Sequence, residues 1–238
     1  NNYSIKTPAL INIDKSVPYF ITDYIEGTFF SELSFSIFNE INVHLFQFYS
    51  EQNALIKKNV RSEFELKINL LFNKVDEYNS KAGVSFKKSL LILVDKINIE
   101  NICLRNDYIY YLNITHGDIN YRENIIKSSN KNLYFIDWEM SRSANLLYDY
   151  FYMLMFDLSN NDNLSNSLLL KSFKNRKQNL FLSNLVNKSF GINININQLR
   201  DYFCLSVLDM MLYKVLIIEK KRIPNLFKKE VDQRFNNI

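Results

Sequence analysis

The spacing of apolar residues changes along the chain, and each change predicts a different kind of structure. Two short apolar runs near the start, residues 8–13 and 18–25, are separated by a polar turn and are typical of paired strands. After them, apolar residues recur at intervals of three and four, and Phe38, Ile41 and Leu45 belong to one such face. The N-terminal part is therefore predicted to be a strand pair followed by a helix.

Helical spacing covers most of the remaining chain, with one interruption in the middle. The expected helices span residues 62–78 with Ser62 as N-cap, 85–97, 146–158, 166–190, 197–222 and 224–235. The interruption holds an expected strand at 108–114 and then a hairpin, whose strands are Asn124–Lys127 and Leu133–Asp137. We therefore expect a mainly α fold with a small β-hairpin.

Composition restricts the class of protein. The chain has 238 residues of which 47% are hydrophobic, enough for a substantial core, and its net charge of +4 comes from scattered residues, which argues against a nucleic-acid partner. No apolar run approaches the roughly 20 residues that span a membrane, and no secretory signal is present. Cys103 and Cys204 are expected to be reduced core thiols in a cytoplasmic protein. Because the first residue is Asn, we expect a segment of a longer polypeptide.

Polar residues converge at one end of the predicted hairpin. Asp118, Glu123 and Asn124 lead into its first strand, and Asp137 and Glu139 follow its second. Because antiparallel strands share their ends, these side chains should lie close together. Clustered carboxylates repel one another unless a cation lies between them, and hard oxygen ligands suit Mg²⁺, which commonly binds substrate phosphates as well. Phosphate chemistry is therefore a candidate.

Three segments at this end carry a more specific signal. They are His116-Gly117-Asp118, Asn124-Ile125-Ile126 and Ile136-Asp137-Trp138-Glu139. Together they resemble the H-G-D-x-x-x-x-N-I and I-D-W-E motifs of the aminoglycoside phosphotransferase and choline kinase family, small-molecule kinases with a protein-kinase-like fold. Residues 19–27 are similar to the hinge strand between the two lobes of such kinases, and residues 145–149 to the helix start after I-D-W-E.

The resemblance implies a protein-kinase-like C-terminal lobe. Residues 1–27 would be the remnant of the N-terminal lobe sheet and the hinge, and residues 28–238 the helical C-lobe that carries the catalytic loop and the metal-binding hairpin. At the hinge, the main-chain carbonyl of Asp23 and the N–H of Ile25 would bind the adenine of ATP, or the base of GTP. The glycine-rich loop and the phosphate-pairing lysine of the first lobe would lie upstream in the parent chain.

The resemblance also implies roles for five side chains. Asp118 would orient the acceptor hydroxyl and take its proton, and His116 would brace the catalytic loop. Asn124 and Asp137 would hold the Mg²⁺ that bridges the nucleotide phosphates. Asp149 would begin its helix and tie down the catalytic loop. The implied activity is transfer of the γ-phosphoryl group of ATP or GTP to a hydroxyl of a small polar molecule.

Some alternatives stay open at this point. Asn124 stands six positions after Asp118, one more than in the family pattern. An outward bulge would keep Asn124 as the metal ligand, and Glu123 is the alternative ligand. A catalytically inactive pseudokinase acting as an interaction module is the alternative function, because the first-lobe lysine is not in this sequence. A metallohydrolase that uses His116 and Asp118 would need further histidines or acids. Aminoglycosides, choline, amino sugars, glycans and nucleosides all fit as acceptors.

Overall fold

The structure is a computed structural model that describes most of the chain. The described residues are 10–14, 19–22, 25–52, 55–76, 87–88, 91, 108–160 and 175–217. The chain divides into two compact units. Unit 1 comprises residues 1–54, 114–143 and 149–196, and unit 2 comprises residues 55–113, 144–148 and 197–238.

Strands and helices alternate along the described chain. The strands are β1 (Leu10–Asp14), β2 (Tyr19–Thr22), β3 (Gly27–Phe29), β4 (Ile56–Asn59), β5 (Ile109–Thr115), β6 (Ile125–Ser128), β7 (Leu133–Phe135) and β8 (Arg142–Asn145). The α-helices are α1 (Phe35–Gln52), α2 (Val60–Asp76), α5 (Tyr148–Asn160), α7 (Arg176–Phe190) and α8 (Leu199–Ile217). Two short 3-10 helices are η1 (Trp138–Met140) and η3 (Ile196–Gln198).

The expectation of a mainly α fold, understood as a protein-kinase-like C-terminal lobe with one small β-hairpin, is wrong. The described residues form a mixed α/β structure with five α-helices and two three-stranded antiparallel sheets, of order β3-β6-β7 and β4-β5-β8. The strands β3 and β4 were missed because every one of their residues is exposed. They lack the alternation of apolar and polar residues that marks a half-buried strand, and only pairing with a partner identifies them.

The predicted hairpin is confirmed and forms the central strand β6 and the edge strand β7 of the sheet in unit 1. β6 and β7 pair antiparallel, with Ile125 opposite Phe135 and Lys127 opposite Leu133. The side chains of Ile125, Leu133 and Phe135 are almost completely buried. Since a shift of one residue would turn these side chains to the opposite face, their burial specifies the register. β3 extends the sheet by pairing with β6.

Helices α1 and α7 pack against each other in unit 1. Phe38, Ile41 and Leu45 have no exposed surface, as their helical spacing predicted. α7 begins after the N-cap Asn175, whose side chain accepts hydrogen bonds from two main-chain N–H groups of the first turn. It ends at Gly191, where a left-handed conformation with φ 63° closes the helix. Of the helix expected over 166–190, the part from Arg176 to Phe190 is confirmed, and the expected continuous helix is wrong at Asn175, which is the extended N-cap; residues 166–174 lie outside the described residues.

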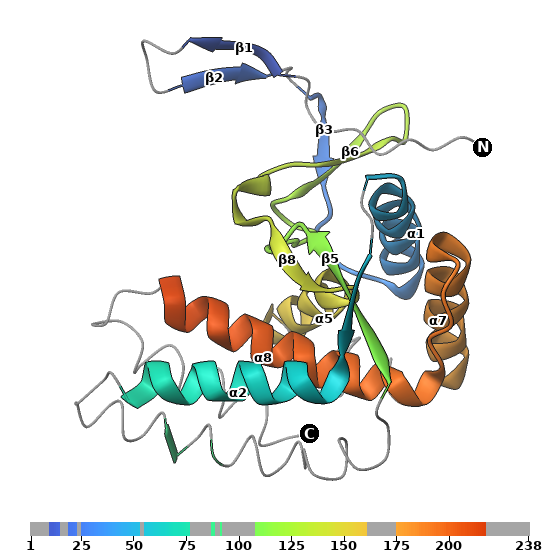
Figure 1. Cartoon of the computed structure of the whole chain (residues 1–238). Helices are drawn as coiled ribbons and strands as arrows, with labels where there is room; N and C mark the ends of the chain where they lie inside the picture. Colours follow the sequence, from blue (N-terminus) through green and yellow to red (C-terminus); the bar gives the residue numbers. More distant parts are fainter. Residues whose placement is uncertain are drawn as a thin grey trace. The chain divides into compact units, whose positions relative to one another are not determined.

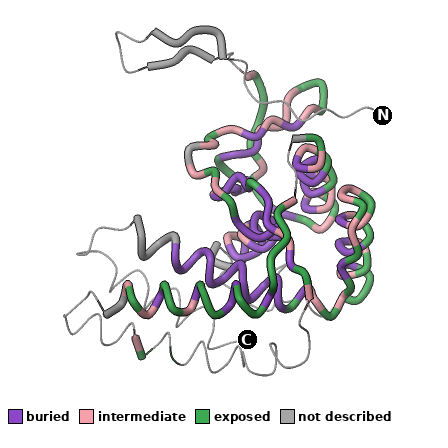
Figure 2. The backbone as a smooth tube through the Cα atoms, viewed as in Figure 1, coloured by how far each residue is buried: buried purple, intermediate pink, exposed green. Residues whose placement is uncertain are grey.

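Unit 2 is built around α2 and α8, which pack together (Figure 1). Residues 201–212 of α8 are all buried (Figure 2), because this helix is apolar on nearly every side. α2 is one-sided and buries Phe64 and Leu71. The main-chain N–H of Ser62 donates to the side-chain oxygen of Asn59 at 3.1 Å. The prediction of Ser62 as the N-cap is therefore wrong, and Asn59 caps the helix.

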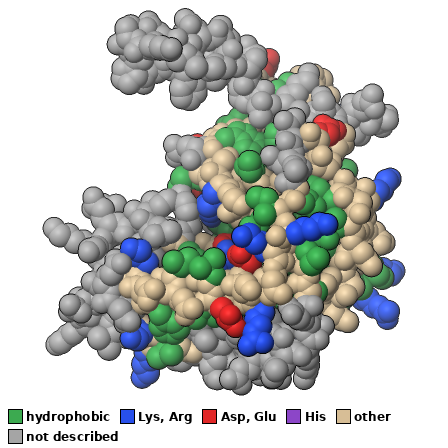
Figure 3. Space-filling model, in the orientation of Figure 1, with side chains coloured by type: hydrophobic (Ala, Val, Ile, Leu, Met, Phe, Trp, Pro, Cys, Tyr) green, Lys and Arg blue, Asp and Glu red, His purple; other side chains and the backbone are tan. Residues whose placement is uncertain are grey.

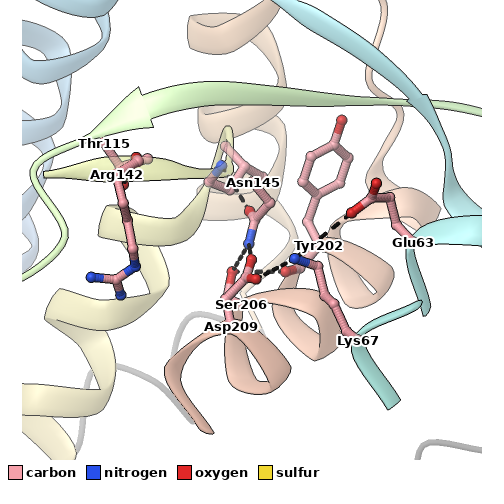
Figure 4. A network of polar contacts seen from close by, with 9 residues as sticks. Glu63, Lys67, Thr115, Arg142, Asn145, Tyr202, Ser206 and Asp209 are labelled. Carbon is pink, nitrogen blue, oxygen red and sulfur yellow. Dashed lines mark hydrogen bonds and ion pairs between the residues drawn. The ribbon is translucent and has the colours of Figure 1, made fainter. Parts of the chain in front are cut away.

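A buried polar network connects α2 with α8 inside unit 2 (Figure 4). The Lys67 ammonium pairs with the Asp209 carboxylate and lies 3.7 Å from the Glu63 carboxylate. All three residues are less than a tenth exposed. The Asn145 amide donates to the Ser206 hydroxyl at 2.7 Å. Paired charges in such a position specify the packing partner more than they add stability.

The described residues also give information on membrane spans, on the distribution of basic side chains and on the cysteines. Within the described ranges, no helix combines the length and the apolar composition needed to cross a membrane. On the face seen in Figure 3, the described Lys and Arg side chains lie at several separate places. Cys204 is a buried free thiol, and burial raises its pKa to about 12. Cys103 and almost all of the expected helices over 85–97 and 224–235 lie outside the described residues.

Candidate active site

The His-Gly-Asp segment follows β5 directly, and the first turn of α5 holds its main chain. The Asp149 carboxylate, in a residue only 1% exposed, accepts hydrogen bonds from the N–H groups of His116 at 2.8 Å and Gly117 at 3.0 Å. The third donor to Asp149 is the Tyr49 hydroxyl. Burial and the neighbouring Asp149 hold the pKa of Tyr49 well above its ordinary value. Three donors compensate the burial of the carboxylate, so the segment is fixed by its main chain.

Gly117 allows the main chain to pass close to another segment. Its φ is +90°, a conformation that residues with a side chain rarely adopt. A Cβ at this position would lie 2.1 Å from the main-chain oxygen of Met140 and 2.9 Å from a guanidinium nitrogen of Arg142. The glycine of the motif is therefore required both by conformation and by space.

Gly117→Ala should lower the free energy of unfolding by about 3 kcal/mol, because main-chain strain and a main-chain clash add together. Gly191→Ala is the matched control. Gly191 also has a positive φ, 63°, but no described residue beyond its neighbours in the chain comes within 4 Å of its Cβ position, so only strain of about 1 kcal/mol is expected. Urea unfolding monitored by circular dichroism measures both. Equal losses of stability for the two variants would show that the short distance to the Met140 oxygen adds no cost beyond main-chain strain.

The His116 side chain connects the two motifs. It is fully buried, its Nε2 donates to the main-chain oxygen of Ile136 at 2.7 Å, and its ring lies 4.6 Å from the ring of Trp138. Because a carbonyl oxygen only accepts, Nε2 carries the proton, and Nδ1 makes no hydrogen bond to any described residue. This arrangement agrees with a bracing role. The metallohydrolase alternative needs further histidines or acids beside His116, and among the described residues no group of three or more His, Cys, Asp and Glu could hold a metal ion.

Asn124 contacts both sides of the site. It is 4% exposed, its side-chain nitrogen donates to the main-chain oxygen of Asp118 at 2.7 Å, and its own main-chain oxygen accepts from Ile136 at 3.0 Å. Because the main-chain oxygen of Asp118 can only accept, the side-chain atom of Asn124 that contacts it must be the amide nitrogen. Within the described ranges, the amide oxygen accepts a single long hydrogen bond, of 3.4 Å, from the Asn120 side chain. It is therefore the atom of Asn124 that could bind a cation.

The residues between Asp118 and Asn124 form a compact turn. The side-chain oxygen of Asn120 accepts from two of the N–H groups that follow it, at 3.1 and 2.8 Å, and its main-chain oxygen accepts from Asn124 at 3.0 Å. An Asn that binds the main chain two or three residues onward is a recognised turn signal, which the sequence analysis did not use. Glu123, the alternative ligand, is exposed on this turn. Asn124, and not Glu123, bonds the main chain of Asp118.

Asp137 adopts a left-handed main-chain conformation, with φ 64° and ψ 57°. This is unusual for a residue with a side chain, and such conformations are frequent at functional sites. Its side chain is exposed and does not cap the short helix η1 that follows. The main-chain oxygen of Ile136 accepts a hydrogen bond from His116, and its N–H donates to the main-chain oxygen of Asn124. Asp137, the next residue, therefore lies at the same end of the hairpin as the His-Gly-Asp segment, as predicted.

The Asp118 side chain has one partner that the sequence analysis missed. The hydroxyl of Tyr152 donates to one oxygen of this partly exposed carboxylate. Tyr152 lies on α5, three residues after Asp149. Helical spacing from Asp149 would have placed it on the same face of the helix, so a signal was present.

The expected adenine contacts are described only in part. Asp23 lies outside the described residues, as does the side chain of Glu139. Ile25 is half-buried and lies between β2 and β3. Its role as a main-chain donor to the nucleotide base stays a prediction.

The resemblance to small-molecule kinases depends mainly on three short segments. The segments 116–118, 124–126 and 136–139 all belong to unit 1, where main-chain hydrogen bonds join them. The chain matches no protein-family model, and no curated protein matches it.

Proposed function

We propose that the chain is the catalytic part of a magnesium-dependent phosphotransferase, related to the aminoglycoside phosphotransferases and choline kinases. It would move the γ-phosphoryl group of ATP or GTP to a hydroxyl of a small polar molecule. The position of Asn124 is the observation that carries the proposal. This residue bonds the main chain of Asp118 at 2.7 Å and of Ile136 at 3.0 Å. It thereby brings a candidate base and two candidate metal ligands to one place, as phosphoryl transfer requires.

The oxygen atoms at this place suit Mg²⁺. The amide oxygen of Asn124 and the carboxylate of Asp137 are hard ligands. Among the side chains that the structure describes, no group of three or more His, Cys, Asp and Glu could hold a metal ion. Two protein ligands are nevertheless enough, since Mg²⁺ usually completes its shell with water and substrate phosphates. Bound Mg²⁺ would neutralise charge on the transferred phosphoryl group.

Asp118 would handle the acceptor. The residue is partly exposed, which supports such a role, because a base must be open to the molecule that it deprotonates. Its main chain is held on both sides, by Asn124 at the carbonyl and by Asp149 through the N–H of Gly117. A fixed carboxylate can orient a hydroxyl and accept its proton with little loss of conformational freedom during the reaction. His116 keeps this segment attached to the strand that leads to Asp137.

The direct test is product formation by the full-length protein. The protein is incubated with Mg²⁺, γ-labelled ATP or GTP, and choline, kanamycin, glucosamine or adenosine as acceptors. We expect a labelled product with at least one acceptor, and we expect EDTA to abolish it. Absence of any Mg²⁺-dependent consumption of ATP or GTP would contradict the proposal.

Asp137→Gly should separate metal binding from stability. Glycine readily adopts the φ of 64° found at this position, so the variant should be at least as stable as the wild type. Loss of the carboxylate should weaken binding of the Mg²⁺-nucleotide by about tenfold or more. Thermal-shift titrations with Mg-ATP, with and without EDTA, measure this.

Asp137→Ala is the control for the preceding variant, because alanine lacks the carboxylate and also disfavours the left-handed conformation. It should lose both stability and Mg-ATP binding. Full stabilisation of Asp137→Gly by Mg-ATP would exclude Asp137 as a ligand.

A catalytically inactive pseudokinase that acts as an interaction module is the second candidate. It is favoured by the turn between Asp118 and Asn124, which is one residue longer than in the family pattern. It predicts stabilisation by Mg-ATP without transfer to any acceptor and without hydrolysis. The two candidates are thus separated by turnover and not by binding.

A further inference from the structure

We infer that Tyr152 is a positioning residue that holds one oxygen of the Asp118 carboxylate so that the other faces the acceptor hydroxyl. The inference rests on the proposed phosphotransferase function. The Tyr152 hydroxyl donates to Oδ1 of Asp118, and both side chains are partly buried in unit 1. A carboxylate can accept about four hydrogen bonds, so this contact leaves Oδ2 available.

Helix α5 contacts each residue of the His-Gly-Asp segment in turn. Asp149 accepts from the N–H groups of His116 and Gly117 at 2.8 and 3.0 Å, and Tyr152 donates to the side chain of Asp118. Asp149 and Tyr152 are three residues apart and therefore share one face of the helix. A single helix thus fixes the main chain of the segment and the side chain of its candidate base.

The remaining freedom of Asp118 is the rotation of its side chain. Asn124 bonds its main-chain oxygen at 2.7 Å, and Asp149 bonds the preceding N–H groups, so the main chain is already fixed. Among the hydrogen bonds between described residues, the one from Tyr152 is what restricts where the two carboxylate oxygens point. A misplacement of about 1 Å can cost about 100-fold in rate, so a group that fixes this rotation contributes to the rate and not to nucleotide binding.

Tyr152→Phe in the full-length protein tests the inference. The assay measures Mg²⁺-dependent consumption of ATP, hydrolysis included, with choline, kanamycin, glucosamine and adenosine present as acceptors. We expect kcat to fall about 10- to 100-fold, while KM for Mg-ATP changes by less than about twofold. Melting temperature is recorded for each variant to show that the fold is retained.

Tyr150→Phe is the matched control. Tyr150 lies two residues from Tyr152 on the same helix, so the two side chains do not share a face, and the Tyr150 ring lies 4.7 Å from that of Phe38. The same chemical change at this position should leave kcat within about twofold of the wild type.

Each outcome decides between the inference and the proposed function. An active wild type and an equally active Tyr152→Phe variant overturn the inference alone. A fall in kcat that is matched by a rise in KM and a lower melting temperature overturns it as well, since a purely structural role explains that pattern. If mass spectrometry finds Tyr152 phosphorylated after incubation with Mg-ATP, this residue is a phosphoryl acceptor, and the inference that it is a positioning group is overturned. No Mg²⁺-dependent ATP consumption by the wild type overturns the proposed function and the inference together.

Discussion

Asp118→Asn should lower the rate of phosphoryl transfer by about 10²- to 10⁴-fold, because an amide cannot take the proton of the acceptor hydroxyl. The replacement keeps the shape of the side chain. Its main-chain oxygen can still accept from Asn124, and its amide oxygen can still accept from Tyr152, so the fold should be unchanged. Single-turnover transfer from γ-labelled ATP measures the rate, and a thermal-shift titration shows that Mg-ATP binding is retained.

Glu123→Gln provides the matched control for the loss of a negative charge near the site. Glu123 is exposed on the turn before Asn124, and the hydrogen bond of its carboxylate within the described part of the chain comes from the Asn120 side chain, at 3.3 Å. This variant should transfer phosphate within about twofold of the wild-type rate. A loss equal to that of Asp118→Asn would return Glu123 to consideration as a metal ligand. Wild-type turnover by Asp118→Asn would remove Asp118 from the proposed mechanism.

Asp149→Ala should have the largest effect on stability, a loss of about 4 kcal/mol in the free energy of unfolding. Asp149 is 1% exposed and accepts from three donors, two of them main-chain N–H groups of the His-Gly-Asp segment. Without this acceptor, the buried Gly117 N–H and the Tyr49 hydroxyl each carry the cost of an unmade hydrogen bond, whereas the His116 N–H can still donate to the Tyr49 hydroxyl, 2.8 Å away. Urea unfolding followed by circular dichroism measures the loss, and transfer activity should disappear with it.

Two graded variants identify the source of this loss. Asp149→Asn keeps one oxygen acceptor and should lose about half as much stability as Asp149→Ala. Tyr49→Phe removes one donor to Asp149 and one acceptor of the His116 N–H, and should lose about 1–2 kcal/mol. If Asp149→Ala were destabilised by less than about 1 kcal/mol, the three hydrogen bonds would not be what holds the segment.

Local regularities predicted much of the secondary structure. The burial of Phe38, Ile41 and Leu45 follows from helical spacing, and the pairing of β6 with β7 follows from two apolar runs around a polar turn. The same hairpin predicted that the residues before β6 and after β7 would meet. In each case the signal is contained within about twenty consecutive residues, where the chain's own periodicity decides which face is buried.

Other local features were present in the sequence but weak. Asn59 and not Ser62 caps α2, although both residue types favour this position. Asn120 closes the turn before Asn124 by accepting two main-chain hydrogen bonds. Several polar residues in a row offer several possible caps and turns, and the choice among them depends on where the neighbouring elements pack.

The sequence by itself determined the helical faces, the hairpin and the order of the motif residues, because these depend on neighbours along the chain. Only the tertiary structure decided what fixes the candidate base. Tyr49 and Asp149 are 100 positions apart, yet they meet at the His-Gly-Asp segment. The exposed strands β3 and β4 likewise exist only through partners far along the chain. Hydrogen bonds between distant segments and the exclusion of water from them arise when the chain packs, and no periodicity along the sequence encodes them.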